Sequence, residues 1–200
     1  MEFEFNCEKL LNCDKYGFAI LEGTNQEYLQ HYNKSQINEI IDRIGYASSK
    51  VKFINKKAQK LNNIITTSVK FFSSYHRLYI KAIDNKVIGI IKTGIKKLFI
   101  RNEHSCLIEV SPQCVLDFYV HESQQRNGVG KVFYLIIKAL FEKMLEFEKI
   151  EPHKLGYDRP SEKFINFLAK HYSLKNYIPQ NNNFVVFNLY FDVINKFILD

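Results

Sequence analysis

The sequence predicts a mixed α/β fold, built on one central sheet, and three observations predict it. Residues 115–120 are rich in β-branched and aromatic residues, which is typical of a strand. A glycine-containing turn follows at 125–130, and an apolar helical pattern begins directly after it. The apolar runs along the chain give the order strand, strand, central strand, helix, strand, helix, strand. The two strands around the first of these helices are therefore expected to be parallel, with a right-handed crossover between them.

The first half of the chain is expected to supply a long helix and a hairpin. Isoleucines 37, 40, 41 and 44 form a helical stripe within residues 29–47, and Ser35 is a suitable N-cap. Asp84-Asn85-Lys86 predicts a tight turn between two strands. The expected strands of this half are short apolar runs bounded by polar residues, at 3–5, 18–21, 77–83, 87–92, 94–100 and 106–110.

The second half predicts two more helices and two more strands. The helix after Gly130 has apolar residues spaced by three and four, which is typical of a helix packed on a sheet. Ser161 is expected to cap the second helix, whose Phe164, Phe167 and Leu168 share one face. Short strands are expected at 154–157 and 184–191. Since no long linker divides the chain, we expect a single domain over 1–191 with a short C-terminal extension at 192–200.

Composition and charge restrict the class of protein. The chain has 200 residues, 46% of them hydrophobic, which is enough for a substantial core. No run approaches the roughly 18 apolar residues of a membrane helix, and the acidic N-terminus lacks the basic region of a signal peptide, so an intracellular protein is expected. The net charge of +7 suits an anionic cofactor, nucleic acid or an acidic protein partner, or is an ordinary lysine-rich surface.

Two patterns argue against a metal site. The four cysteines, at 7, 13, 106 and 114, contain no C-x-x-C pair. His121-Glu122 does not begin an H-E-x-x-H motif, because Gln125 stands where the second histidine would be. We therefore expect neither a metal nor a dithiol centre.

The turn at Gln125-x-x-Gly128-x-Gly130 is a candidate anion site. Glycines let the backbone approach a ligand closely, and the N-terminus of the following helix carries partial positive charge, so a pyrophosphate fits this turn. The alternative is a plain tight turn. The dinucleotide pattern G-x-G-x-x-G is absent, as is the Walker pattern. What remains resembles the Q/R-x-x-G-x-G/A motif with which Gcn5-related N-acetyltransferases hold the pyrophosphate of acetyl-CoA.

Longer motifs resemble one family within this superfamily, the α-tubulin N-acetyltransferases. The matching segments extend from about Ser48 to Phe187, at 57–59, 88–92, 94–98, 114–123, 125–130, 151–155, 158–161, 170–172 and 179–187. The resemblance implies a mostly antiparallel mixed sheet with helices on both faces and two splayed parallel central strands. It also implies acetyl transfer from acetyl-CoA to a lysine of α-tubulin in the microtubule lumen. We expect a monomer on cytoplasmic microtubules, axonemes or other stable arrays included, without nucleic-acid or membrane partners.

The resemblance also implies the site residues. It assigns catalytic roles to Gln59, Cys114 and Asp158. It assigns cofactor contacts to residues of the central strand, the glycine turn and the second helix, namely Phe118, Tyr119, Val120, Gln125, Arg126, Asn127, Gly128, Val129, Gly130, Lys131, Ser161, Lys163, Phe164, Phe167 and Lys170.

Acetylation of a lysine requires a proton acceptor, since a lysine amine with a pKa near 10.4 is almost fully protonated at neutral pH. The candidate bases near the central strand are Asp117, His121, Glu122 and Asp158, together with the Cys114 thiol. Asp158 is either the base or a helix cap, although Ser161 already offers a cap. Cys114 is either a small buried residue or a thiolate with a lowered pKa. Direct transfer needs no acetyl-cysteine, so a ternary complex is expected.

Three further points stay open at this stage. Gln59 has no useful proton chemistry, so it orients the substrate or is simply an exposed polar residue. The lysines of 50–60 and the pair Lys96-Lys97 face acidic tubulin or solvent. A second function is acetylation of another protein lysine or a small amine, and a third is a non-catalytic microtubule-binding module.

Overall fold

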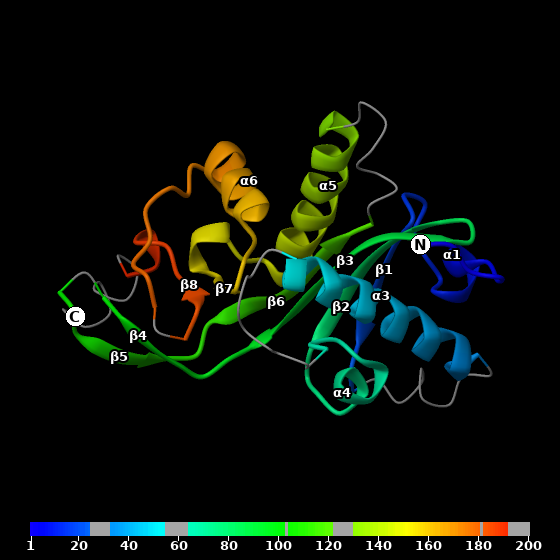
Figure 1. Ribbon diagram of the computed structural model, residues 1–200, viewed down its shortest axis with the longest axis horizontal. Coiled ribbons are helices and arrows are strands. Elements are labelled where there is room, and N and C mark those ends of the chain that lie inside the picture. Colours follow the sequence, from blue (N-terminus) through cyan, green and yellow to red (C-terminus); the bar gives the residue numbers. More distant parts are fainter. Residues whose placement is uncertain (25–32, 55–63, 103, 122–129, 181, 192–200) are drawn as a thin grey trace. The chain divides into compact units, whose positions relative to one another are not determined.

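The computed structural model describes most of the chain (Figure 1), namely all residues except 25–32, 55–63, 103, 122–129, 181 and 192–200. The described chain forms two compact units. Unit 1 comprises Met1–Lys92 and Asp117–Met144, and unit 2 comprises Thr93–Leu116 and Leu145–Asp200. Strands β3 (Lys86–Ile95) and β6 (Gln113–Val120) and helix α5 (Gly130–Glu148) each continue from one unit into the other.

Unit 1 is an antiparallel sheet with helices packed on it. Its other elements are α1 (Cys7–Leu10), β1 (Phe18–Glu22), α3 (Lys34–Ile54), α4 (Ser68–Phe72) and β2 (Arg77–Ile83). The strands are hydrogen-bonded in the order β1-β2-β3-β6. In the β1–β2 pair Phe18 lies opposite Lys81 and Glu22 opposite Arg77. The hairpin predicted from Asp84-Asn85-Lys86 is confirmed, and Asp84 adopts the positive φ of 52° that such a tight turn requires.

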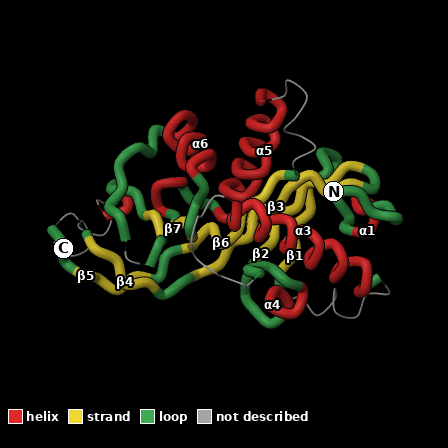
Figure 2. The backbone as a smooth tube through the Cα atoms, in the orientation of Figure 1, coloured by secondary structure: helices red, strands yellow, loops and turns green. Residues whose placement is uncertain are grey.

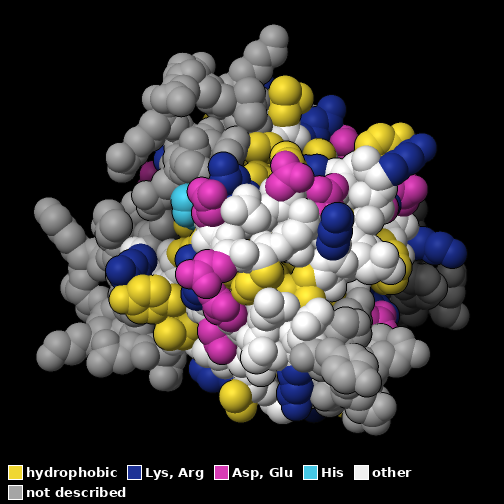
Figure 3. Space-filling view, turned by 90° about the vertical axis from the view of Figure 1, so that its right-hand side faces the viewer, with side chains coloured by type: hydrophobic (Ala, Val, Ile, Leu, Met, Phe, Trp, Pro, Cys, Tyr) yellow, Lys and Arg dark blue, Asp and Glu magenta, His cyan; other side chains and the backbone are white. Residues whose placement is uncertain are grey.

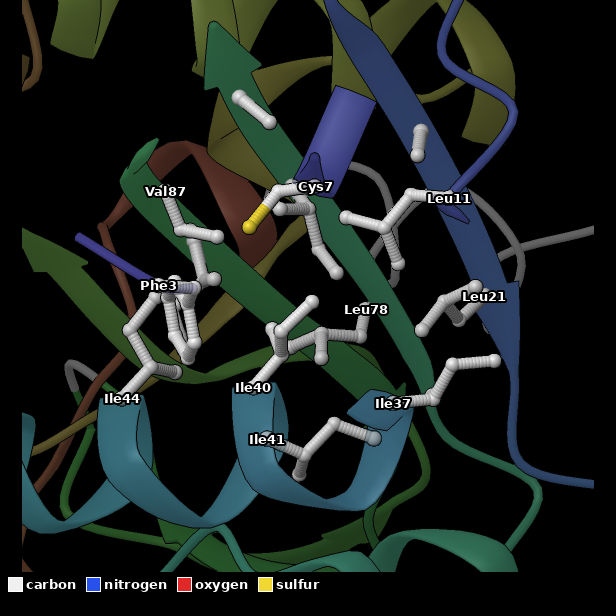
Figure 4. Packing of buried hydrophobic residues seen from close by; sticks show 14 of the residues in the cluster. Phe3, Cys7, Leu11, Leu21, Ile37, Ile40, Ile41, Ile44, Leu78 and Val87 are labelled. Carbon is white, nitrogen blue, oxygen red and sulfur yellow. The ribbon is translucent and has the colours of Figure 1, made fainter. Parts of the chain in front are cut away.

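The core of unit 1 lies between α3 and the sheet. The four isoleucines of the predicted stripe, at 37, 40, 41 and 44, are all at most 1% exposed. Ile37, Ile40 and Ile44 point toward the side of the helix where Leu21, Leu78, Val87, Phe3 and Cys7 lie, and Ile41 belongs to the same cluster (Figure 4). Complete burial of one such side chain stabilises a fold by about 1.5–3 kcal/mol. The apolar face of this helix therefore fixes α3 on the sheet.

Both faces of the unit 1 sheet are covered. In β2, Leu78, Ile80 and Ala82 belong to the core under α3. Tyr79, which lies between them and points to the opposite face, is only 1% exposed. Helix α5 contributes a second buried stripe, at Ile137, Leu140, Phe141 and Met144. Figure 2 shows α5 and α3 as the two long helices of the molecule. The predicted pattern of α5, a helix packed on a sheet, is confirmed.

Unit 2 contains the parallel strand pair. Its elements besides β3, β6 and α5 are β4 (Leu98–Arg101), β5 (Leu107–Val110), η2 (Pro152–Lys154), β7 (Gly156–Asp158), α6 (Glu162–Tyr172) and β8 (Phe184–Val185). β6 pairs with β7 in parallel, with Cys114 opposite Gly156 and Val115 opposite Tyr157. β8 is antiparallel to β7, and β4 and β5 form a separate antiparallel pair. The predicted parallel arrangement of the strands around α5 is thus confirmed.

Some local predictions were wrong, for identifiable reasons. Residues 3–5 form no regular strand, because only Glu2 bridges to Lys86 before the Asn6 side chain caps α1. Ser35 is not the N-cap, since α3 begins at Lys34 and the first helical hydrogen bonds go to the carbonyl of Asn33. The same helix continues to Ile54, beyond the predicted end.

Two predicted strands are shorter than expected. The run 94–100 is divided between β3 and β4, because the chain leaves the ladder at Lys96-Lys97. The run 184–191 forms a regular strand only over Phe184–Val185. Phe187 then makes an isolated bridge to Tyr177, and the Tyr190 and Phe191 amides turn back to the carbonyls of Phe187 and Asn188. Among the described helices, none is long and apolar enough to cross a membrane.

Candidate active site

The parallel pair in unit 2 encloses the Cys114 thiol. Cys114 is completely buried, and its Sγ donates to the Pro112 carbonyl oxygen at 3.4 Å. A Cβ atom at Gly156 would lie 2.7 Å from this sulfur, so the missing side chain at 156 makes room for the thiol. Burial, reinforced by the negative charge of Asp158, raises the pKa of Cys114 to about 12. The thiol therefore stays protonated at neutral pH in this structure, and the catalytic role of Cys114 remains a prediction.

Asp158 ends strand β7 in the same unit, and its side chain is 12% exposed. The guanidinium of Arg159 binds both carboxylate oxygens, with Nε–Oδ1 at 2.8 Å and Nη2–Oδ2 at 3.1 Å. Arg159 has a positive φ of 46°, and its amide donates to the carbonyl of Asn183 at 3.1 Å. A bidentate pair of this kind fixes the plane of a carboxylate as well as its position.

Asp158 does not cap the following helix. The Ser161 hydroxyl accepts the Phe164 amide at 3.3 Å and is the N-cap of α6, as predicted. This excludes the cap interpretation of Asp158. Its carboxylate is therefore available at the carboxyl end of a parallel strand, where open α/β sheets bind their ligands.

Helix α6 presents two kinds of residue. Phe164 and Phe167 are buried and stack with ring centroids 6.0 Å apart, and Tyr157 contacts Phe164 edge-on at 5.9 Å. Ser161, Lys163 and Lys170 are exposed. Among the residues that the resemblance assigns to the cofactor in this helix, the aromatic ones thus build the unit 2 core, and the polar ones face outward.

The end of strand β6 and the start of α5 lie in unit 1. Phe118 is half-buried, whereas Tyr119 and Val120 are at most 6% exposed. The His121 amide donates to the Ile88 carbonyl at 2.8 Å, so the ladder with β3 continues to the end of β6. Helix α5 begins at Gly130, directly after the glycine turn, as predicted.

Several predicted site residues lie outside the described part of the chain. They are Gln59, Glu122 and the turn residues Gln125, Arg126, Asn127, Gly128 and Val129. The side chain of Lys131 is likewise not described.

Asp117 is excluded as the general base. It is 2% exposed, and its carboxylate accepts the hydroxyls of Ser48 at 2.7 Å and Thr66 at 2.6 Å. A carboxylate buried in this way inside a core is unreachable for a substrate amine. No sequence pattern indicates these partners, which are 69 and 51 residues away. The one available hint was an acidic residue on the strand face that also carries Val115 and Tyr119.

Two of the lysines proposed to face a partner have contacts within the chain. Lys97 pairs with Glu109 at 2.7 Å, and Lys50 lies over the ring of Tyr46 at 4.5 Å. On the face shown in Figure 3, Lys and Arg side chains are interspersed with Asp and Glu side chains. Within the described residues, no three His, Cys, Asp or Glu side chains are grouped in a way that could hold a metal ion.

Parallel strands joined through a helix that begins at the second glycine of a G-x-G sequence are the arrangement of the GNAT acetyltransferase class. A family model described as GNAT acetyltransferase, Mec-17, matches residues 5–197. The chain belongs to this family. The match is wider than the region from 48 to 187 that carried the resemblance.

Curated relatives agree with this assignment. The chain is similar to three proteins named alpha-tubulin N-acetyltransferase. The one from Tetrahymena thermophila is 41% identical over 192 residues, which are 96% of this chain and 45% of the relative. The one from Trichoplax adhaerens is 49% identical over 169 residues, 78% of this chain and 66% of the relative. The one from Aedes aegypti is 39% identical over 202 residues, 96% of this chain and 68% of the relative. The chain thus spans about half to two thirds of these relatives.

Proposed function

We propose that this protein transfers the acetyl group of acetyl-CoA to the ε-amine of a lysine of α-tubulin. The observation that carries the proposal is the family match over residues 5–197, together with relatives named for this activity. The unit 2 site supports it, because an oriented carboxylate at a parallel strand end suits proton removal from an amine. Residues 1–191 act as one acetyltransferase domain in this proposal.

Acetyl-CoA is the proposed co-substrate, and the local structure fits its pyrophosphate. Helix α5 begins at Gly130, so its N-terminal amides and partial positive charge lie directly after the glycine turn. The proposed contacts are Phe118, Tyr119, Val120 and the turn residues from Gln125 to Lys131. On α6, Ser161, Lys163 and Lys170 are exposed and offer a hydroxyl and two cations to an anionic ligand. Bound acetyl-CoA supplies the activated acetyl thioester.

Asp158 is the proposed proton acceptor. Each carboxylate oxygen has two lone pairs, so both can accept a further hydrogen bond beside Arg159. Cys114 acts as a neutral residue that shapes the site, since its raised pKa keeps the thiol protonated. Gln59 orients the lysine by hydrogen bonds. Direct transfer to the lysine needs no acetyl-cysteine intermediate, so the reaction takes place within a ternary complex.

The proposed setting is the cytoplasmic microtubule. The protein acts as a monomer on tubulin assembled in microtubules, at the lumenal face, and needs neither nucleic acid nor membrane. Tubulin is acidic, so exposed lysines such as Lys50 assist association and make it dependent on salt.

The decisive experiment incubates the protein with acetyl-CoA and polymerised tubulin, and detects acetyl-lysine on α-tubulin by mass spectrometry. We expect acetylation by the wild type and a strong loss with Asp158→Asn. A protein that binds acetyl-CoA but acetylates no tubulin contradicts the proposal. A panel of other protein lysines and small amines then tests the alternative acceptors, and microtubule pelleting tests a non-catalytic binding module.

A further inference from the structure

The interior of unit 1 contains a polar cluster that the proposed chemistry does not use. Asp117 of strand β6 is 2% exposed, yet it carries a carboxylate. Its Oδ1 accepts the hydroxyl of Ser48, and its Oδ2 accepts the hydroxyl of Thr66. Ser48 and Thr66 are themselves at most 2% exposed. A carboxylate withdrawn from water is tolerated only where it is hydrogen-bonded, so Asp117 requires these two hydroxyls. In return, the carboxylate holds Ser48 and Thr66 in place.

Helix α3 and the chain at Thr66 also meet through their backbones. A Cβ atom at Gly45 would lie 1.8 Å from the Thr66 carbonyl oxygen, so only glycine permits this approach. Ser48 follows Gly45 by three residues and lies on the same side of the helix. The hydroxyl of Ser48 is thereby directed to the carboxylate that also binds Thr66.

A second buried side chain holds the same stretch. Lys92 of strand β3 is 3% exposed, and its Nζ donates to the Ile65 carbonyl at 2.9 Å. The chain at residues 65–66 is therefore held by two neighbouring strands. The Lys92 cation of β3 binds Ile65, and the Asp117 carboxylate of β6 binds Thr66.

The position of these anchors in the chain suggests their purpose. Ser48 precedes residues 55–63 and Thr66 follows them, so one carboxylate binds the chain on both sides of that segment. The segment contains Gln59. Asp117 itself lies in β6 between Cys114 and Phe118. Its two hydrogen bonds thus tie both flanks of the segment to the strand that carries proposed site residues.

We propose that Asp117 is a positioning residue for acetyl transfer, which fixes the chain on both sides of residues 55–63 relative to strand β6. The inference rests on the proposed function, in which Gln59 orients the acceptor lysine. Asp117 then acts through Ser48 and Thr66 and takes no proton itself. A reacting amine that is displaced by even 1 Å can react about 100-fold more slowly. Removing one of the two hydrogen bonds to Asp117 is therefore expected to slow turnover without changing the affinity for acetyl-CoA.

The test variant is Thr66→Val, which removes the hydroxyl and keeps the shape of the side chain. We expect kcat with microtubules to fall about tenfold, while the Kd for acetyl-CoA stays within twofold. Thr66→Ser restores the hydroxyl, so its kcat is expected to return to within twofold of the wild type. A loss as large in Thr66→Ser as in Thr66→Val would overturn the proposal.

A matched control separates positioning from stability. Thr93 is also completely buried, and its hydroxyl donates to the Glu148 carboxylate at 2.9 Å. Thr93→Val makes the same chemical change in unit 2 and is expected to lower Tm by a similar amount with little change in kcat. Equal losses of kcat in both valine variants would mean that only stability is involved, which contradicts the inference.

A double-mutant cycle with Gln59→Ala identifies the route of the effect. If Thr66 acts through Gln59, Thr66→Val causes no further loss of kcat in the Gln59→Ala background. Losses that multiply contradict the inference. Hydrogen exchange of residues 64–68 provides a readout without tubulin, and we expect faster exchange in Thr66→Val than in Thr93→Val. Wild-type protein that fails to acetylate tubulin refutes the proposed function, whereas unchanged exchange in Thr66→Val refutes the anchor.

Discussion

Cys114 and Gly156 lie opposite one another on parallel strands, and the sulfur of the first occupies the space where the second would carry a Cβ atom. The thiol is kept from solvent by this contact and by the Pro112 ring, which lies 3.5 Å from the same Cβ position. A substitution at residue 156 therefore tests how closely the backbone packs on the Cys114 thiol.

Gly156→Ala is expected to lower the free energy of unfolding by about 1–3 kcal/mol, because the added methyl overpacks the buried thiol. Urea unfolding at pH 7 measures the change. Cys114→Ala removes the sulfur and serves as the partner in a double-mutant cycle. The combined variant should recover a large part of the loss, and strictly additive losses would show that the two residues do not compete for this space.

The raised pKa of Cys114 predicts how stability depends on pH. The thiol pKa is about 12 in the folded protein, against 9.0 for a thiol exposed to water in the unfolded chain, so between these values only the folded chain keeps the proton. Stability is complete below pH 9 and decreases as pH rises. Between pH 8 and 10 the wild type should lose about 1 kcal/mol more than Cys114→Ala.

Unfolding curves of both proteins at several alkaline pH values test this difference. Cys7 and Cys13 also have pKa values raised by burial, to about 11, but they are present in both proteins and cancel. Parallel pH dependences of wild type and variant would show that Cys114 is not buried as described.

Asp158→Asn tests the proposed base. The amide keeps the shape of the side chain but cannot take a proton, so kcat with microtubules should fall at least about 100-fold. Acetyl-CoA binding, measured by isothermal titration calorimetry, should change less than threefold. Arg159→Lys is the companion variant, since lysine keeps the charge and loses the bidentate geometry that fixes Asp158. Unchanged turnover in Asp158→Asn removes this residue from the mechanism.

Gly128→Val tests the glycine turn. A branched side chain crowds backbone amides that are proposed to bind the pyrophosphate, so the Kd for acetyl-CoA should rise about tenfold or more. Val69→Ala, at a residue of α4 that is 79% exposed and outside the proposed site, is the control and should leave the Kd within twofold. A variant Gly128→Val that binds acetyl-CoA as the wild type does would reject the turn as the binding site.

Local patterns were sufficient for much of the fold. Strand β2 coincides with the alternating run 77–83, Ser161 caps α6, and α5 starts at Gly130. Each of these depends on residues within one or two turns of each other, so the sequence determines them locally. Hydropathy does not predict where the strand in the run 184–191 ends. The chain turns away from the sheet there, and the Asn188 amide donates to the Asn176 carbonyl.

The environment of the site depended on contacts that the sequence does not reveal. The state of the Cys114 thiol depends on Gly156, which lies 42 positions away and is brought opposite by strand pairing. The sequence leaves Asp117 among the candidate bases near the central strand, and only the contacts of its carboxylate with Ser48 and Thr66 exclude it. Distant partners of this kind are set by topology, which a periodic pattern does not encode.

The chain passes between units 1 and 2 three times, after residues 92, 116 and 144, and each passage lies inside β3, β6 or α5. An inter-domain linker would have offered a place to cut, whereas here every boundary falls within hydrogen-bonded backbone. Neither half can therefore be expressed, exchanged or inherited as a module on its own. Splitting this protein into complementing fragments would require breaking a strand or a helix that both fragments need.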